Sequence, residues 1–198
     1  MNELISQDAF SPQVMCSQLS EFAGRVEQLC RLIGLDATSL KLDHVAMRIN
    51  QRLAAQLAHQ QWADCGRVIS QAQINGRPII VIKLAQPLTI GCWVTDCVEL
   101  PYPAAGKAYA EQGWEHVEFV VPCDVKNGDD FINRVKQFFP QLAENWPRLA
   151  DLGVVIKVSS PQGEGERLAN PTIALKWKQV CIKLHPHSLE AVIASEQK

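Results

Sequence analysis

Two short stretches of the sequence place an acidic residue and a histidine at the start of a β-prone run. LDHVAMRIN contains Asp43 and His44, and GWEHVEFVV contains Glu115 and His116, 72 positions after the first histidine. Apolar and β-branched residues dominate the rest of both runs, as is typical of buried strands. A single histidine of this kind is more often a hydrogen-bonded core residue than a metal ligand. Two histidines in matching positions favour a ligand role.

Side-chain alternation along each predicted strand adds polar groups to the faces that carry the histidines. Arg48 shares the face of His44, and Glu118 shares the face of His116. A strand of a curved sheet can aim such a face into a shared concavity. We therefore expect the two faces to line one pocket.

Two other predicted strands carry residues that could complete a metal site. Glu99 ends the predicted strand over 91–99, and the last predicted strand places Lys183 and His185 on one face. Two imidazoles and a carboxylate are ligands that borderline divalent ions choose, so the sequence predicts a site for zinc, nickel, iron or manganese. The alternatives are a solvated strand end at Glu99 and an ordinary ion pair between Lys183 and Glu118.

The elements that would position these residues recur in the same order in each half of the chain. Each half reads strand, helix, strand, strand, strand, an internal repeat that indicates the fold. The first half predicts strands over 42–49, 66–74, 79–84 and 91–99, a helix over 51–64, and a hairpin turn at Asn75-Gly76. The second predicts strands over 114–121, 153–158, 170–176 and 180–185, and a helix with the apolar stripe Phe131, Val135, Phe138 and Leu142. We expect an α+β fold in which two βαβββ modules form a curved mixed sheet around a central cavity.

Additional helices are predicted at both ends of this repeat. Ser11-Pro12 is typical of a helix start, an apolar stripe runs from Met15 to Ile33 in steps of three and four, and Gly34 is a plausible stop. Ser188 can cap a C-terminal helix. The stripe is short for a coiled coil, so packing on its own domain is favoured over dimerisation. We expect a helical extension over 1–36 and modules over 37–106 and 107–198.

Composition narrows the classes of partner. The net charge of −2 and the lack of a basic run exclude a nucleic-acid footprint. No apolar stretch approaches the roughly 20 residues that span a bilayer, and the first residues lack the features of a secretory signal. The seven cysteines form no C-x-x-C pair, which favours reduced thiols. We expect a cytoplasmic monomer or homodimer whose partner is a small-molecule ligand or substrate.

Six motifs together resemble the YecM family of small bacterial proteins over nearly the whole chain: LDHVAMR, NGRPI, VELPYP, GWEHVE, SSPQGEGERLANPT and IKLHPHSLEAVIASEQ. The paired modules also resemble the vicinal oxygen chelate superfamily, which includes glyoxalase I and the extradiol dioxygenases. That resemblance implies metal ligands on the first and fourth strands of each module, which here match His44, Glu99 and His116. It implies a divalent metal ion and a lyase, isomerase or dioxygenase that acts on a small oxygenated substrate.

The fourth ligand position departs from the superfamily pattern. A glutamate is usual there, but this sequence has Lys183, whose ammonium group cannot ligate a cation. His185 could substitute for it, or water could fill the open position; with Lys183 in place, a non-catalytic pocket that binds a small molecule without metal is the alternative. If a metal ion binds, Glu118 is the candidate catalytic base, and Arg48 or Lys183 would bind a substrate carboxylate or phosphate. The glycine-rich loop over 159–167 is expected to cover the pocket or to form a surface connection.

Overall fold

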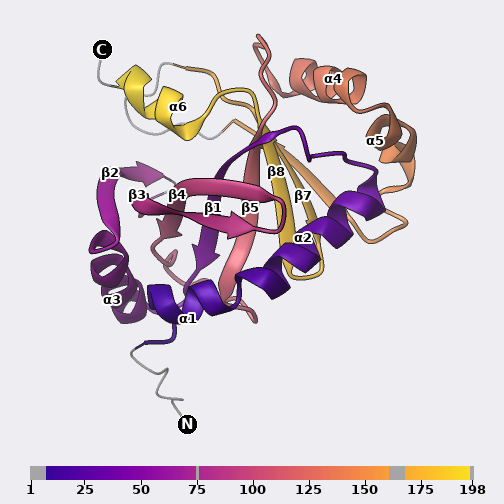
Figure 1. The fold of residues 1–198 in the computed structure, drawn as a ribbon. Coiled ribbons are helices and arrows are strands. Elements are labelled where there is room, and N and C mark those ends of the chain that lie inside the picture. The colour runs from indigo at the N-terminus through magenta and orange to yellow at the C-terminus, as the bar shows by residue number, and fades with distance from the viewer. Residues whose placement is uncertain (1–7, 75, 161–167, 197–198) are drawn as a thin grey trace.

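The protein folds as one eight-stranded mixed sheet with helices around it (Figure 1), as the sequence predicts. The computed structural model describes residues 8–74, 76–160 and 168–196, so residues 161–167 of the predicted pocket loop lie outside the described residues. The strands are β1 Lys41–Arg48, β2 Gly66–Ile74, β3 Arg77–Ile90, β4 Trp93–Pro101, β5 Gly113–Val120, β6 Val155–Ser159, β7 Thr172–Trp177 and β8 Val180–His185. The helices are α1 Pro12–Ser17, α2 Leu19–Ile33, α3 Arg52–Ala63, α4 Gly128–Phe138, α5 Pro140–Asn145, the 3-10 turn Trp146–Arg148, and α6 Leu189–Glu196.

The strand order displays the repeat directly. Across the sheet the order is β2-β3-β4-β1-β5-β8-β7-β6, so the two halves mirror each other about the β1–β5 pair. β1 and β5 pair antiparallel, whereas β1 pairs parallel with β4 and β5 pairs parallel with β8. The first strand of each module therefore lies between the other module and its own fourth strand. The module boundaries at residues 36 and 106 stay a prediction.

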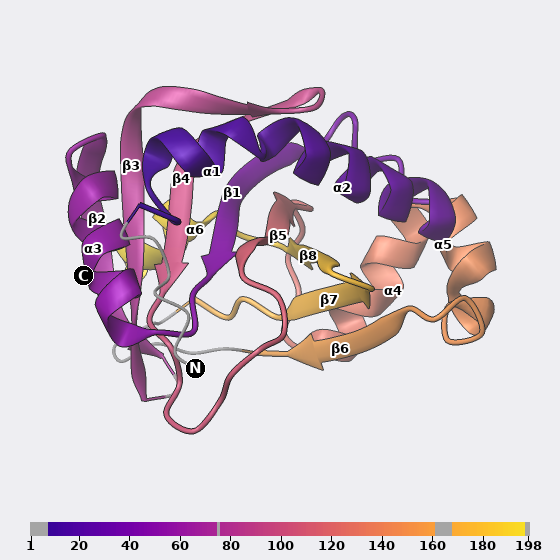
Figure 2. The ribbon, with the colours of Figure 1, turned by 90° about the horizontal axis from the view of Figure 1, so that it is seen from below.

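The N-terminal helices pack on the sheet of their own chain. The apolar stripe is buried against the core, at 7% exposure or less for Met15, Leu19, Phe22, Val26, Leu29 and Ile33. Figure 2 shows α1 and α2 lying along one side of the sheet. Three tryptophan indoles donate hydrogen bonds of 2.8–2.9 Å to backbone carbonyls at or next to these helices. The pairs are Trp62 to Phe10, Trp93 to Ala37 and Trp114 to Met15. These contacts leave the stripe covered within the chain rather than open to a second copy.

Both long predicted helices are divided. As predicted, Ser11 caps the start of α1, and Gly34 ends α2 with a left-handed φ of 77°. The helix is interrupted at Gln18, which separates α1 from α2. In the second module the helix breaks at Phe139, because the following Pro140 disfavours a helical conformation in the residue before it. The break leaves Phe138 half exposed, so its predicted place in the apolar stripe was wrong.

The two faces of the central strands have different surroundings. Val117 and Phe119 of β5 lie in the hydrophobic core, and the alternate residues His116 and Glu118 face a cavity on the opposite side. Ser188 caps α6, which forms part of the wall of that cavity. All seven cysteines are free thiols. Among the described residues, no helix has both the length and the apolar character needed to cross a membrane.

The burial of the N-terminal stripe makes a prediction about stability. Phe22→Ala should lower the free energy of unfolding by about 3–5 kcal/mol, because it removes a fully buried aromatic ring and leaves a cavity. Leu53→Ala on α3 is the control, since Leu53 is 71% exposed and its loss should change stability by less than about 0.5 kcal/mol. Urea unfolding measures both. Equal effects of the two substitutions would contradict the packing of α2 on the sheet.

Candidate metal centre

The cavity lies on the inner face of the curved sheet and has a volume of about 360 Å³. All eight strands and α6 contribute to its wall. The wall contains every residue that the sequence predicts for the site: His44, Arg48, Glu99, His116, Glu118, Lys183 and His185. Segments far apart in the chain therefore meet in one pocket, and the histidines and carboxylates among them could hold a metal ion.

Two register shifts in the β1–β5 pair bring each acid–histidine pair to this face. The pairing steps past Asp43 on β1 and past Glu115 on β5, so each acidic residue is the extra residue of a bulge. In a regular strand, neighbours such as Asp43 and His44 would point to opposite faces. The bulges let each carboxylate contact the histidine that follows it.

In both pairs the carboxylate binds the same ring nitrogen. Asp43 Oδ2 lies 3.1 Å from Nδ1 of His44, and Glu115 Oε2 lies 3.2 Å from Nδ1 of His116. A carboxylate can only accept a hydrogen bond, so Nδ1 carries a proton in each ring, and in the neutral ring Nε2 keeps its lone pair. This is the arrangement that orients a histidine ligand toward a metal ion.

The two Nε2 atoms converge on the carboxylate of Glu118. Glu118 Oε1 lies 3.3 Å from Nε2 of His44 and 3.0 Å from Nε2 of His116. These three residues are buried, and their ligand atoms lie within 4.8 Å of one another. Glu99 approaches the same two nitrogens, with oxygens 3.7 Å from His44 and 3.9 Å from His116. Nε2 of His44 is buried and makes no hydrogen bond to any residue that the structure describes.

Lys183 reaches into the centre of this group. Its Nζ lies 2.7 Å from Glu118 Oε1 and 2.9 Å from Nε2 of His116. The ammonium group therefore contacts two of the atoms that would ligate an ion. Burial lowers the pKa of Lys183, but the Glu118 and Glu99 carboxylates outweigh it and raise that pKa, so the amine stays charged.

The charges of the site act strongly on one another. Burial lowers the pKa of His44, but the carboxylates of Glu118 and Asp43 outweigh it and raise the pKa to about 10. Burial raises the pKa of Glu118, whereas Lys183 and His44 hold it well below its ordinary value. Glu118 is thus a carboxylate that carries its charge inside the protein, stabilised by the cations that face it.

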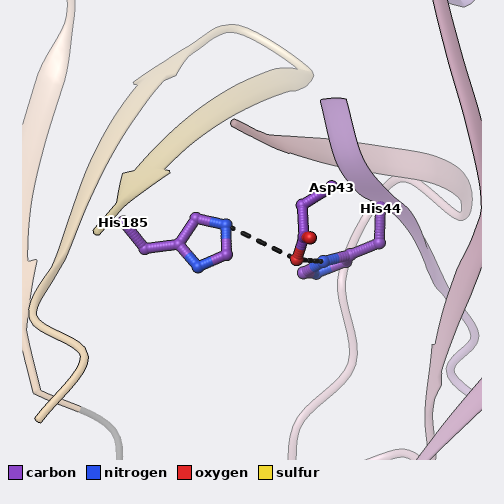
Figure 3. Close-up of side chains that lie close together, drawn as sticks. All are labelled: Asp43, His44 and His185. Carbon is purple, nitrogen blue, oxygen red and sulfur yellow. Dashed lines mark hydrogen bonds and ion pairs between the residues drawn. The ribbon is translucent and has the colours of Figure 1, made fainter. Parts of the chain in front are cut away.

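His185 has a different surrounding from the other two histidines. Its Nδ1 lies 3.2 Å from Nδ2 of the Asn170 side chain. Its Nε2 lies 3.7 Å from Asp43 Oδ2 (Figure 3) and 3.9 Å from Glu118 Oε2. The carboxylate of Asp43 thus lies between His44 and His185, and these three residues form a second group that could hold a metal ion. Burial lowers the pKa of His185, which favours the neutral ring.

Arg48 lines the cavity and already contacts two other side chains. Its guanidinium group pairs with Glu115 and lies 3.9 Å from the centre of the Tyr109 ring. The cavity wall also contains Arg77 and Lys157, two cations that the sequence analysis did not select. Arg77 donates to the backbone carbonyl of Tyr102, at 3.0 Å.

Sequence reasoning missed three further residues of the site. Asp43 and Glu115 were visible in the acid–histidine pattern, but strict alternation places them on the far face of each strand, and only a bulge changes that. Asn170 follows a loop and had no local signal. The repeated acidic residue before each histidine was the signal that could have found the first two.

Comparison with known proteins supplies the family. Residues 11–196 match the model of the family described as YecM protein. The chain belongs to the YecM family. It is 38% identical over 185 residues to Protein YecM of Escherichia coli (strain K12), covering 93% of this chain and 94% of that relative. It is 34% identical over 182 residues to an uncharacterized protein of Haemophilus influenzae, covering 89% and 90%.

The fold is shared with a solved structure of similar length. The structure described as "Structural Genomics, Protein EC4020" is 32% identical to this chain and superposes with a TM-score of 0.78. The match covers 97% of both chains. The family likeness thus extends from sequence to the whole architecture, including the strands that carry the cavity residues.

The surroundings of Glu115 predict how stability changes in acid. Burial raises the pKa of Glu115, but His116 and Arg48 outweigh it and lower the pKa to about 2 from an ordinary value of 4.5. The folded state therefore gains stability from the ionised carboxylate above pH 4.5, and loses it as pH falls toward 2. Glu115→Gln should cost roughly 1–3 kcal/mol near neutral pH and progressively less in acid.

Urea unfolding of the wild type and of Glu115→Gln at a series of pH values measures this difference. Glu144→Gln is the control, because Glu144 is exposed on α5. A cost of Glu115→Gln that stayed constant from pH 6 to pH 2 would contradict the pairing of Glu115 with His116 and Arg48.

Proposed function

We propose that this YecM-family chain binds a divalent metal ion in its central cavity and acts with it on a small oxygenated substrate. The observation that carries the proposal is the convergence of two repeat-related histidines on one carboxylate, each with its Nδ1 held by the preceding acid. The mirrored strand order about β1 and β5 supports a place in the vicinal oxygen chelate superfamily. The reaction would then be that of a lyase, an isomerase or a dioxygenase.

The charge of the site is compatible with a divalent cation. Ion pairs connect four carboxylates around the two histidines, which contribute a charge of −4: Asp43, Glu99, Glu115 and Glu118. The permanent cations Arg48 and Lys183 contribute +2. The remaining charge of −2 can be balanced by protons on the two histidines or by one divalent ion. Buried charge needs such a balance, because an unpaired ion in the interior is strongly destabilising.

The residues present fit such an ion. His44, His116 and Glu118 offer a two-histidine, one-carboxylate set, and Glu99 lies within reach as a further oxygen ligand. Nε2 of His44 is buried beside two carboxylates and makes no hydrogen bond within the described residues, which is accounted for if it ligates an ion. A bound ion would act as a Lewis acid that stabilises negative charge on two adjacent substrate oxygens. Zinc, nickel, iron and manganese all accept these ligands.

The cavity wall suits a small polar molecule with an apolar side. Ile74, Ile79, Leu189 and Val192 give part of the wall an apolar surface. We propose that Arg48 and Lys183 bind a carboxylate or phosphate of the substrate, with Arg77 and Lys157 as further cations at the cavity.

The remaining expectations about partners and location also stay proposals. The net charge of −2 supports a small-molecule partner rather than nucleic acid, and no membrane partner is proposed. The free thiols support a reducing compartment such as the cytoplasm. The covered N-terminal stripe supports a monomer, and a homodimer would need another surface.

One contact favours a second candidate function. The ammonium group of Lys183 contacts both Glu118 and His116, where a metal ion would otherwise bind. This contact supports a binding module that holds a small anionic molecule without metal. In that case the protein would bind its ligand without turnover, and a chelator would leave its thermal stability unchanged.

Metal binding provides the test of the main proposal. The wild type, freed of metal with a chelator and then titrated with zinc or manganese, should bind about one ion per chain. His44→Ala and His116→Ala should each weaken binding by about 100-fold or more, beyond the effect expected from an outer-shell change. His59→Ala is the matched control, because His59 lies on α3 and is not part of the cavity wall. Unchanged binding in both His44→Ala and His116→Ala would refute the site.

The same titration separates the roles of the two glutamates. If Glu118 ligates the ion, Glu118→Gln should weaken binding more than Glu99→Gln, because Glu118 is closer to both Nε2 atoms. A larger loss of affinity in Glu99→Gln would make Glu99 the carboxylate ligand and leave Glu118 free to act as the catalytic base. The sequence predicts these two roles.

Removal of Lys183 distinguishes the two candidate functions. Lys183→Met should tighten metal binding by about 10-fold or more, because it removes a positive charge beside the ligands. It should also lower the stability of the metal-free protein, because Glu118 loses its cation. Calorimetric titration and thermal unfolding measure the two effects. If the wild type and Lys183→Met both fail to bind metal, the binding module without metal is favoured.

A further inference from the structure

The three histidines of the cavity differ in what holds Nδ1. In His44 and His116 this nitrogen donates a hydrogen bond to a carboxylate. In His185 it contacts the side-chain amide of Asn170, at 3.2 Å. An amide can present either its oxygen or its nitrogen, so the tautomer of His185 depends on which end of Asn170 faces the ring.

The backbone of His187 fixes the orientation of that amide. Oδ1 of Asn170 accepts from the backbone N–H of His187, at 3.1 Å, and Nδ2 of Asn170 donates to the backbone carbonyl of His187, at 3.3 Å. Turning the amide by half a rotation would set its NH₂ group against that N–H and its oxygen against that carbonyl. Both contacts would become repulsive, so the NH₂ group is the end that faces His185.

This orientation determines where the proton of His185 lies. Because the NH₂ group of Asn170 donates, Nδ1 of His185 must accept and cannot carry a proton. The neutral ring then has its proton on Nε2. Nδ1 of His185 is therefore unprotonated, whereas Nδ1 of His44 and of His116 carries a proton. An N–H group at Nε2 has no lone pair with which to bind a cation.

The Nε2–H group of His185 is buried at the cavity without a hydrogen-bond partner among the described residues. The two nearest carboxylates, those of Asp43 and Glu118, are 3.7 Å and 3.9 Å away, too far for a hydrogen bond. Buried donors are almost always paired, so this donor, which lines a cavity and has no partner among the described residues, is suited to a molecule bound there. An oxygen atom of a bound molecule or of water is the partner that fits.

We propose that His185 donates a hydrogen bond from Nε2 to an oxygen atom of the molecule bound in the cavity, rather than ligating the metal ion. Asn170 acts as a positioning residue that keeps the proton on Nε2. The identity of that molecule as an oxygenated metal-bound substrate rests on the proposed function, but the tautomer of His185 does not. This role is an alternative to the fourth-ligand role that the sequence predicts for His185.

Nuclear magnetic resonance of the metal-free, ¹⁵N-labelled protein tests the tautomer alone. Long-range ¹H–¹⁵N spectra distinguish a ring protonated on Nε2 from one protonated on Nδ1. His185 should show the Nε2–H pattern, and Asn170→Asp should convert it to the Nδ1–H pattern, because a carboxylate accepts where the amide donated. An Nδ1–H pattern for His185 in the wild type would overturn the proposal, whether or not the protein binds metal.

Binding measurements test the role of the donor. His185→Phe should change zinc affinity by less than about 3-fold, whereas the matched variant His44→Phe should lose about 100-fold or more. Acetohydroxamate, a small chelator with two adjacent oxygens, is the probe for the zinc-loaded protein. Its affinity should fall by about 10-fold in His185→Phe, the effect of one lost hydrogen bond.

Each binding outcome has a distinct meaning. A loss of zinc affinity in His185→Phe as large as that in His44→Phe would make His185 a ligand and overturn the proposal. Unchanged acetohydroxamate affinity would overturn the donor role. If the wild type itself binds no zinc, the proposed metal function fails, and the spectra of the metal-free protein still decide whether His185 carries its proton on Nε2.

Discussion

The site depends on two register shifts in one pair of strands. Where β1 and β5 meet, each strand carries one extra residue, and in both strands that residue is acidic and precedes a histidine. Without the shifts, Asp43 and Glu115 would point into the hydrophobic core, where an unpaired carboxylate is strongly destabilising. With them, each acid binds the Nδ1 of its own histidine. Both imidazoles are thereby oriented with Nε2 toward the centre of the cavity.

The centre of the cavity is consequently a place where positive charge must be present. Glu118 is buried between two imidazoles and an ammonium group, and its negative charge is stable only because of these neighbours. Protons on the histidines, the ammonium group of Lys183 and a divalent ion all compete for the same few oxygen and nitrogen atoms. The proposed metal binding would therefore displace protons and move Lys183 away from His116.

The repeated order of strands and helices was predictable from local patterns. Apolar periodicity and the Ser11 cap locate most elements to within a few residues, because these signals act over short stretches of chain. Alternation also placed His44, His116 and Glu118 correctly on faces that line one cavity. The break at Phe139 was predictable in principle from Pro140, and the apolar spacing concealed it.

The parts of the site that escaped prediction depend on pairing between distant segments. The bulges at Asp43 and Glu115 exist only in the register of β1 against β5, and a single strand carries no sign of them. The position of Asn170 depends on the backbone of His187, and the strands β7 and β8 separate these two residues in the sequence. Alternation assigns a face to each residue, but it says nothing of the atom that lies opposite Nδ1 of each histidine.

Asp43 links this chemistry to the wall of the cavity. Besides binding His44, its Oδ2 accepts from the backbone N–H of Leu189, at 2.8 Å, at the first residue of α6. The Lys83 side chain also holds α6 through Glu190. A carboxylate at a helix N-terminus is stabilised by the unpaired N–H groups there. Displacement of α6 would remove that N–H from Asp43 and alter the group that orients His44. The same contact therefore closes one side of the cavity and keeps a candidate ligand in its metal-binding orientation.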